Sequence, residues 1–139
     1  MSIIYTAHAT ATGGRTGKVS TDDGKITVPL SSPGTGGAGT NPEQLFASGY
    51  GACFSGACQY LAKQQGLEMG DIEVKTDINL HKGDDGFKLS AALDVTLPNL
   101  DHDAAVKLVT AAHDFCPYSK ATRGNIDVTL KVNGQDIHA

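Results

Sequence analysis

The most constraining feature of this sequence is a long segment without charge. No charged residue occurs between Glu43 and Lys63. If the segment is helical, apolar side chains cover every face of it: Phe46, Ala47, Tyr50, Ala52, Cys53, Phe54, Ala57 and Tyr60. A helix that is apolar all round is buried on all sides. One sheet of so short a chain cannot cover it completely, so we expect a second copy of the chain to cover the rest.

The residues around this segment are typical of helix ends. Asn41 suits the N-cap, Pro42 suits the first helical position, and Gln44 follows the cap at the spacing of a capping box. Gly66 can end the helix. The pattern therefore predicts one helix that runs from Pro42 to about Gln65.

The rest of the chain alternates between strand-like and helix-like patterns. Period-two alternation and turn residues predict strands, and Asp101 and Pro117 would begin and interrupt a second helix. The expected order is strands over 3–11, 18–20 and 26–30, a loop over 31–40, the long helix, strands over 72–80 and 87–97 around a turn at 81–86, the second helix, a turn at 118–124, and a last strand over 126–132. This order predicts an α+β fold and a single domain over residues 1–139.

Composition excludes several classes of function. The chain has 139 residues and a net charge of −4, which argues against a nucleic-acid partner, because phosphate recognition needs a basic surface. No stretch approaches the roughly 20 apolar residues of a membrane span. The first residues lack a basic segment and a long apolar run, so we expect no signal peptide.

The three cysteines raise the possibility of thiol chemistry. Cys53 lies deep in the apolar helix, where burial would raise its pKa above about 8.5 and make it inert unless a cation is brought to it. Cys58 would point well away from Cys53 on the same helix and is interpreted as structural. The sequence shows no metal-ligand spacing and no nucleotide-binding glycine motif, so no metal or cofactor is expected.

Only two arginines could activate a thiol, Arg15 and Arg123. Glycines flank Arg15, so its backbone can approach another group closely. Arg123 is interpreted as a solvated or structural residue of a turn. Glu43 would either complement the helix dipole or hold an arginine. Because Glu43 and Cys53 would be roughly 15 Å apart along a straight helix, one arginine reaches both only if the helix breaks or a second chain contributes one of them.

Cys116 is predicted where the second helix stops, and such a thiol can be mobile enough to meet another sulfur. His113 lies one turn earlier and could form a Cys-His pair, although a solvated histidine at the helix edge is the simpler interpretation. The residues alone indicate possible thiol chemistry and no more.

Two long segments resemble a known family. Residues 40–54, which begin TNPEQLF and end in Cys53-Phe54, and residues 116–128, which begin CPYS, resemble the organic hydroperoxide resistance (Ohr) proteins of the OsmC superfamily. The segment Gly13-Gly14-Arg15 and the hairpin that follows it are similar as well. The resemblance extends from end to end of the chain.

The resemblance implies an OsmC-like fold, with antiparallel sheets around a long buried central helix, in an intertwined homodimer. It implies a cytoplasmic thiol peroxidase that acts on alkyl and fatty-acid hydroperoxides and is recycled by the lipoyl dithiols of lipoylated proteins, without metal or flavin. Matched by motif, Cys53 corresponds to the peroxidatic cysteine and Cys116 to the resolving one. Arg15 and Glu43 correspond to the catalytic ion pair.

Three further residues are candidates for an apolar substrate pocket: Phe46, Phe54 and Tyr118. Gly51, Lys120 and the third cysteine depart from the common family pattern, and Gly51 could loosen the helix before Cys53. Two alternative functions are a peroxide-sensing or lipid-binding thiol switch without turnover, and a hydrolase that uses Cys116 with His113.

Overall fold

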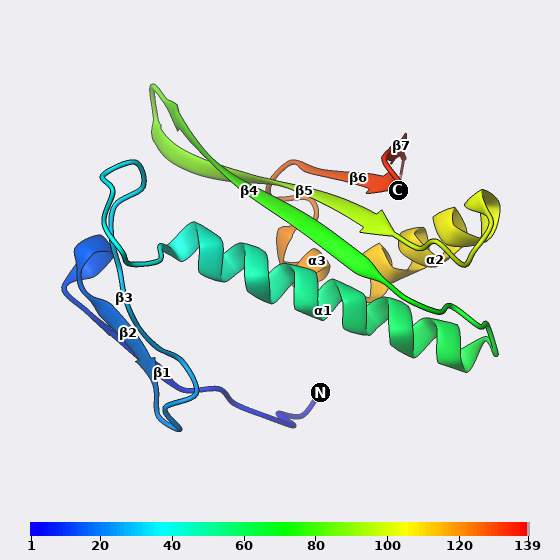
Figure 1. Cartoon of the computed structure of the whole chain (residues 1–139), viewed down its shortest axis with the longest axis horizontal. Helices are drawn as coiled ribbons and strands as arrows, with labels where there is room; N and C mark the ends of the chain where they lie inside the picture. The colour runs from blue at the N-terminus through cyan, green and yellow to red at the C-terminus, as the bar shows by residue number, and fades with distance from the viewer. Residues whose placement is uncertain (139) are drawn as a thin grey trace. The chain divides into compact units, whose positions relative to one another are not determined.

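The computed structural model describes residues 1–138 and divides the chain into two compact units, Met1–Leu45 and the residues from Phe46 onward. Each unit is described by itself. Both contain a sheet, and the second also contains the packed helices (Figure 1). The α+β prediction is confirmed, and the assignment of all 139 residues to one domain stays a prediction.

The first unit is built on a three-stranded antiparallel sheet in the order β1 (Ala9–Thr12), β2 (Lys18–Thr21) and β3 (Thr27–Pro29). The predicted strand over 3–11 is wrong at its start, because the pairing with β2 begins only at Ala9, opposite Thr21. A strand needs a partner for its backbone groups, and the four-residue β2 offers none for the earlier residues. Residues 22–26 connect β2 to β3.

The long helix α1 (Pro42–Gln64) begins and ends where the sequence predicts, to within one residue. The side chain of Asn41 accepts a hydrogen bond from the Gln44 backbone N–H at 2.9 Å, which is the predicted N-cap. Gly66 follows the helix with a φ of 66°, a left-handed conformation that glycine adopts without strain.

Burial along α1 is one-sided within this chain. Its buried side chains are Tyr50, Phe54, Ala57, Cys58 and Ala62. Ala52, Gly56 and Tyr60 are exposed. The expected cover over that face by a second chain stays a prediction.

The second unit contains a four-stranded sheet in the order β4 (Glu73–Gly83), β5 (Gly86–Thr96), β6 (Val128–Val132) and β7 (Gln135–Ile137). β4 and β5 form the predicted hairpin, but its turn is shorter than expected. Both strands continue to the Gly83–Gly86 pair, so only two residues connect them. β6 runs parallel to β5, because α2 and α3 carry the chain back across the sheet before β6 begins.

The helices α2 (His102–Phe115) and α3 (Pro117–Thr122) complete the second unit. Asp101 caps α2 as predicted and accepts a hydrogen bond from the Ala104 N–H at 2.8 Å. Pro117 stops α2 as expected, but the predicted turn at 118–124 is largely the short helix α3. One face of α2 shares a core with α1 and with the buried side of β5, through Leu93, Val95, Leu108, Val109 and Ala112.

No helix within residues 1–138 is both long and apolar enough to cross a membrane.

Candidate functional site

Two cysteine sulfurs meet in the second unit. The Sγ atoms of Cys53 and Cys116 are 3.6 Å apart, and both thiols are free. Cys53 lies in α1 and is partly buried, whereas Cys116 is buried between α2 and α3. A disulfide has an S–S distance of about 2.05 Å, so the two sulfurs need to approach by about 1.5 Å to form one.

Features of the surroundings of Cys53 shift its pKa in opposite directions. Burial is the largest effect and raises the pKa of the thiol, because a low-dielectric surrounding disfavours the thiolate. The backbone N–H of Tyr118 works against this effect, since a hydrogen bond to sulfur stabilises the negative charge. Within its own unit, Cys53 is therefore a weak acid that needs a positive charge to become a nucleophile at neutral pH.

The first unit holds an arginine–glutamate pair. The Nη2 atom of Arg15 lies 2.8 Å from Oε1 and 2.6 Å from Oε2 of Glu43. Arg15 lies on a 3-10 turn, Gly14–Thr16, between β1 and β2, and Glu43 lies in the first turn of α1. The hydrogen bond from Arg15 is the main reason why the pKa of Glu43 is lowered, so the carboxylate stays ionised. Of the two roles that the sequence left open for Glu43, the structure shows the one in which it holds an arginine.

Three aromatic rings of α1 and α3 pack against one another: those of Phe46, Tyr50 and Tyr118. Their centroids are 5.8 to 6.2 Å apart. Tyr118 approaches α1 at Gly49, where an added Cβ would lie 2.8 Å from its hydroxyl oxygen. Tyr118 is 40% exposed and can meet a ligand. Phe54, the third pocket candidate, is completely buried in the core instead.

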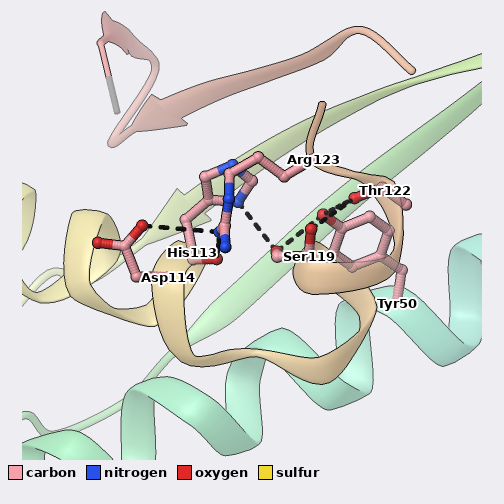
Figure 2. A network of polar contacts seen from close by, with 6 residues as sticks. All are labelled: Tyr50, His113, Asp114, Ser119, Thr122 and Arg123. Atoms are coloured by element: carbon pink, nitrogen blue, oxygen red, sulfur yellow. Dashed lines mark hydrogen bonds and ion pairs between the residues drawn. The ribbon is translucent and has the colours of Figure 1, made fainter. Parts of the chain in front are cut away.

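The structure corrects the simpler interpretation of His113. Its side chain is buried, not solvated, and its Nδ1 atom is 2.9 Å from the Ser119 hydroxyl oxygen. Burial is the main reason why the pKa of His113 is lowered, and the positive charge of Arg123 acts in the same direction. Arg123 donates a hydrogen bond to the His113 backbone carbonyl at 2.6 Å and pairs with Asp114 at 3.6 Å, so it is structural, as one of its two interpretations predicts (Figure 2).

Sequence reasoning missed two buried residues of α3: Ser119, which contacts His113, and Thr122. Ser119 and Thr122, in the Ohr-like segment after Cys116, both form hydrogen bonds with the Tyr50 hydroxyl. The signal available in the sequence was the spacing around Cys116: His113 precedes Cys116 by three residues, and Ser119 follows it by three.

The third cysteine, Cys58, is inert by its environment. It is fully buried, and burial raises its pKa to about 12. Gly51, the other notable departure in α1, faces β4, where an added Cβ would lie 2.8 Å from Oγ1 of Thr76. The helix continues through Gly51 without a break.

We expect iodoacetamide to distinguish the cysteines. At pH 8 a thiol with a pKa of about 12 is ionised to about one part in ten thousand, so Cys58 should stay unlabelled in the native protein while Cys53 reacts. Peptide mass spectrometry of native and urea-unfolded samples makes the comparison, and the unfolded sample should carry label on Cys58. Rapid labelling of native Cys58 would contradict the buried position.

The sequence and the fold of this chain match a defined family. The family model for OsmC-like proteins matches residues 34–131 of the chain. Among solved structures, the organic hydroperoxide resistance protein OhrB of Bacillus subtilis has a TM-score of 0.89 at 47% identity, covering 94% of this chain and all of the other. An organic hydroperoxide resistance protein from Legionella pneumophila has a TM-score of 0.90 at 43% identity, covering 94% of this chain and 98% of the other.

Curated relatives agree with the solved structures. OhrB of Bacillus subtilis strain 168 is 48% identical over 134 residues, which cover 93% of this chain and 98% of OhrB. The organic hydroperoxide resistance protein of Xanthomonas axonopodis pv. citri is also 48% identical, over 92% of this chain and 94% of that protein. The chain belongs to the OsmC family and, within it, to the organic hydroperoxide resistance (Ohr) proteins.

Proposed function

We propose that this chain is a thiol peroxidase that contributes to organic hydroperoxide resistance by reducing organic hydroperoxides to alcohols. The observation that carries the proposal is the 3.6 Å approach of two free thiols, Cys53 and Cys116, from separate elements of the second unit. The names of its Ohr relatives supply the substrate class.

In the first step, the Cys53 thiolate attacks the outer oxygen of the hydroperoxide. The S–O bond forms as the O–O bond breaks, and the alkoxide takes a proton to leave as the alcohol. Cys53 is thereby oxidised to a sulfenic acid and the peroxide is reduced by two electrons. Because only the thiolate reacts, the rate depends on overcoming the effect of burial on the pKa of Cys53.

In the second step, the Cys116 sulfur attacks the sulfenic sulfur of Cys53. The S–S bond forms, and the sulfenic oxygen leaves as water with the thiol proton. The short separation of the sulfurs favours this reaction over a second attack by peroxide. A dithiol then reduces the disulfide by exchange and is itself oxidised. We propose a lipoyl dithiol of a lipoylated protein for this role, as the Ohr resemblance implies.

Arg15 is the cation that we assign to Cys53. Arg123, the other arginine of the sequence, already contacts the His113 carbonyl and Asp114. A guanidinium group keeps its charge at every physiological pH and can donate hydrogen bonds to a thiolate and to the departing oxygen together. Glu43 would fix its orientation. We further propose that the working form is an intertwined homodimer, located in the cytoplasm.

The aromatic residues support a preference for apolar peroxides. The Phe46 ring packs edge-on against the ring of Tyr118, which is partly exposed and whose backbone N–H hydrogen-bonds Cys53. An apolar substituent on the peroxide can pack against these rings, whereas hydrogen peroxide has none to offer. The alternative hydrolase needs His113 to act on Cys116, but Nδ1 of His113 bonds Ser119. The geometry therefore favours the peroxidase.

Peroxide consumption by the purified chain tests the proposal. With dihydrolipoamide as reductant, we expect many turnovers of tert-butyl or linoleic hydroperoxide and much slower consumption of hydrogen peroxide. Omission of the dithiol should leave one equivalent consumed per site. A single equivalent consumed even with the dithiol present would indicate a peroxide sensor. Equal rates with both classes of peroxide would contradict the apolar pocket.

A further inference from the structure

A buried hydrogen-bond network connects α1, α2 and α3 (Figure 2). The Tyr50 hydroxyl of α1 lies 2.8 Å from the Ser119 hydroxyl oxygen and 3.0 Å from Oγ1 of Thr122, both in α3. Nδ1 of His113 in α2 lies 2.9 Å from the same Ser119 oxygen. Ser119 therefore joins all three helices through one hydroxyl group.

Three members of this network lie three residues from a cysteine in the sequence. Tyr50 precedes Cys53 by three residues in α1, His113 precedes Cys116 by three, and Ser119 follows Cys116 by three. Residues three apart in a helix lie on neighbouring positions of one face. Tyr50 and Cys53 are such a pair in α1, whereas Cys116 is the capping residue between α2 and α3. The network thus connects the turn of α1 that carries Cys53 with the two helix ends that flank Cys116.

The number of hydroxyl protons determines which group donates and which accepts in each hydrogen bond of the network. Each hydroxyl has one proton to donate. One arrangement satisfies all four contacts at once: Thr122 donates to the Ser119 backbone carbonyl at 3.2 Å, Tyr50 donates to Thr122, and Ser119 donates to Tyr50. The Ser119 oxygen must then accept from Nδ1 of His113, which carries the proton. Because burial also disfavours the charged ring, His113 is neutral with its proton on Nδ1.

The position of Cys116 depends on the two helices, α2 and α3, that this network connects. Its N–H donates to the Ala112 carbonyl in α2, and its carbonyl accepts from the Lys120 N–H in α3. Its side chain therefore follows any change in the angle between α2 and α3. If the helices separate, the sulfur spends less time at the distance from which it can attack Cys53.

We propose that the network of Tyr50, His113, Ser119 and Thr122 positions Cys116 for disulfide formation. The proposal rests on the peroxidase function, in which Cys116 resolves the Cys53 sulfenic acid. These four residues are positioning residues, since none needs to touch the peroxide. Their loss is expected to slow the second step and to spare the first.

The principal test uses Ser119→Ala and His113→Ala, followed by rapid quenching and mass spectrometry. We expect Cys53 sulfenic acid to form within about twofold of the wild-type rate, and disulfide formation to slow about tenfold, the effect of one lost hydrogen bond. Cys53 sulfinic acid should accumulate at high peroxide. Unchanged disulfide formation in both variants, or an equal decrease of both steps, would overturn the proposal.

Matched variants distinguish positioning from a general loss of structure. The side-chain amide of Asn can replace an Nδ1–H donor, so His113→Asn should recover most of the disulfide rate that His113→Ala loses. Ser55→Ala removes a hydroxyl from α1 that bonds only its own helix backbone at Gly51, and should behave as wild type. Failure of His113→Asn to recover the rate would count against the donor role.

A measurement without peroxide separates this proposal from the peroxidase function. In a glutathione redox buffer, the equilibrium between reduced and disulfide forms of Cys53 and Cys116 reports how closely the thiols are held. Ser119→Ala should shift this equilibrium toward the reduced form by about tenfold, whether or not the chain reduces peroxides. Nitrogen-15 NMR of His113 should show protonated Nδ1 in the wild type. No shift of the equilibrium, or a proton on Nε2 alone, would refute the assignment.

Discussion

Replacement of Cys53 by serine is expected to abolish organic hydroperoxide reduction completely. A serine hydroxyl is not ionised at neutral pH, and no other cysteine can replace it: Cys58 is buried with a pKa raised to about 12, and Cys116 is buried between two helices. A ferric xylenol orange assay of remaining peroxide, with dihydrolipoamide present, measures the loss. Retention of turnover in Cys53→Ser would disprove the assignment of the nucleophile.

Cys116→Ser is the matched control, because it removes the other sulfur of the same pair. This variant should still consume the first equivalent of peroxide and accumulate Cys53 sulfenic acid, then sulfinic acid, as the resolving thiol is missing. Cys58→Ala should keep full turnover. If Cys116→Ser turns over like the wild type, resolution occurs without an internal disulfide.

Replacement of Arg15 by alanine is expected to give the second largest effect, a decrease in kcat/KM of about 100- to 1,000-fold, comparable to the loss of one preorganised charge-stabilising donor at other enzyme sites. Burial raises the pKa of Cys53, and under the proposed function the Arg15 guanidinium lowers it again. Removing that cation raises the pKa, so the pH at which activity increases should move upward. A pH profile of kcat/KM with tert-butyl hydroperoxide measures both effects.

Arg15→Lys and Glu43→Gln test the geometry of the pair. Lysine keeps the charge but lacks the planar group with several donors, so Arg15→Lys should recover only part of the rate. Both carboxylate oxygens of Glu43 accept hydrogen bonds from Nη2 of Arg15, and Glu43→Gln removes this carboxylate. The variant should lose less activity than Arg15→Ala. A wild-type pH profile in Arg15→Ala would show that another group activates Cys53.

The sequence predicted best where local chemistry determines the structure. Helix ends depend on a few neighbouring atoms, so Asn41, Gly66 and Asp101 located the ends of helices correctly. The hairpin of β4 and β5 was also predicted from the alternation of apolar and polar residues along each strand. Such alternation arises because one face of a strand is buried and the other is not. In these cases the information lies within a few residues.

Features that depend on distant partners were predicted less well. β1 begins at Ala9 only because β2 is short, and β6 is parallel only because two helices cross the sheet first. His113 is buried because Ser119 and Tyr50 form a partner site for it, and Tyr50 lies far away in the sequence. The residues alone singled out the cysteines, Arg15 and Glu43, and the Ohr resemblance assigned their catalytic roles, whereas no local pattern indicated the network behind the thiols.

The two thiols that approach to 3.6 Å are 63 residues apart in the sequence. A bond between them would close a long loop in the unfolded chain and reduce its entropy, which corresponds to about 4 kcal/mol of added stability in the chain-entropy model. Under the proposed cycle, each turnover therefore alternates between a less stable reduced form and a more stable oxidised one. The resistance of the protein to unfolding would then rise with peroxide and fall with its reductant, so that melting temperature becomes a measure of redox state.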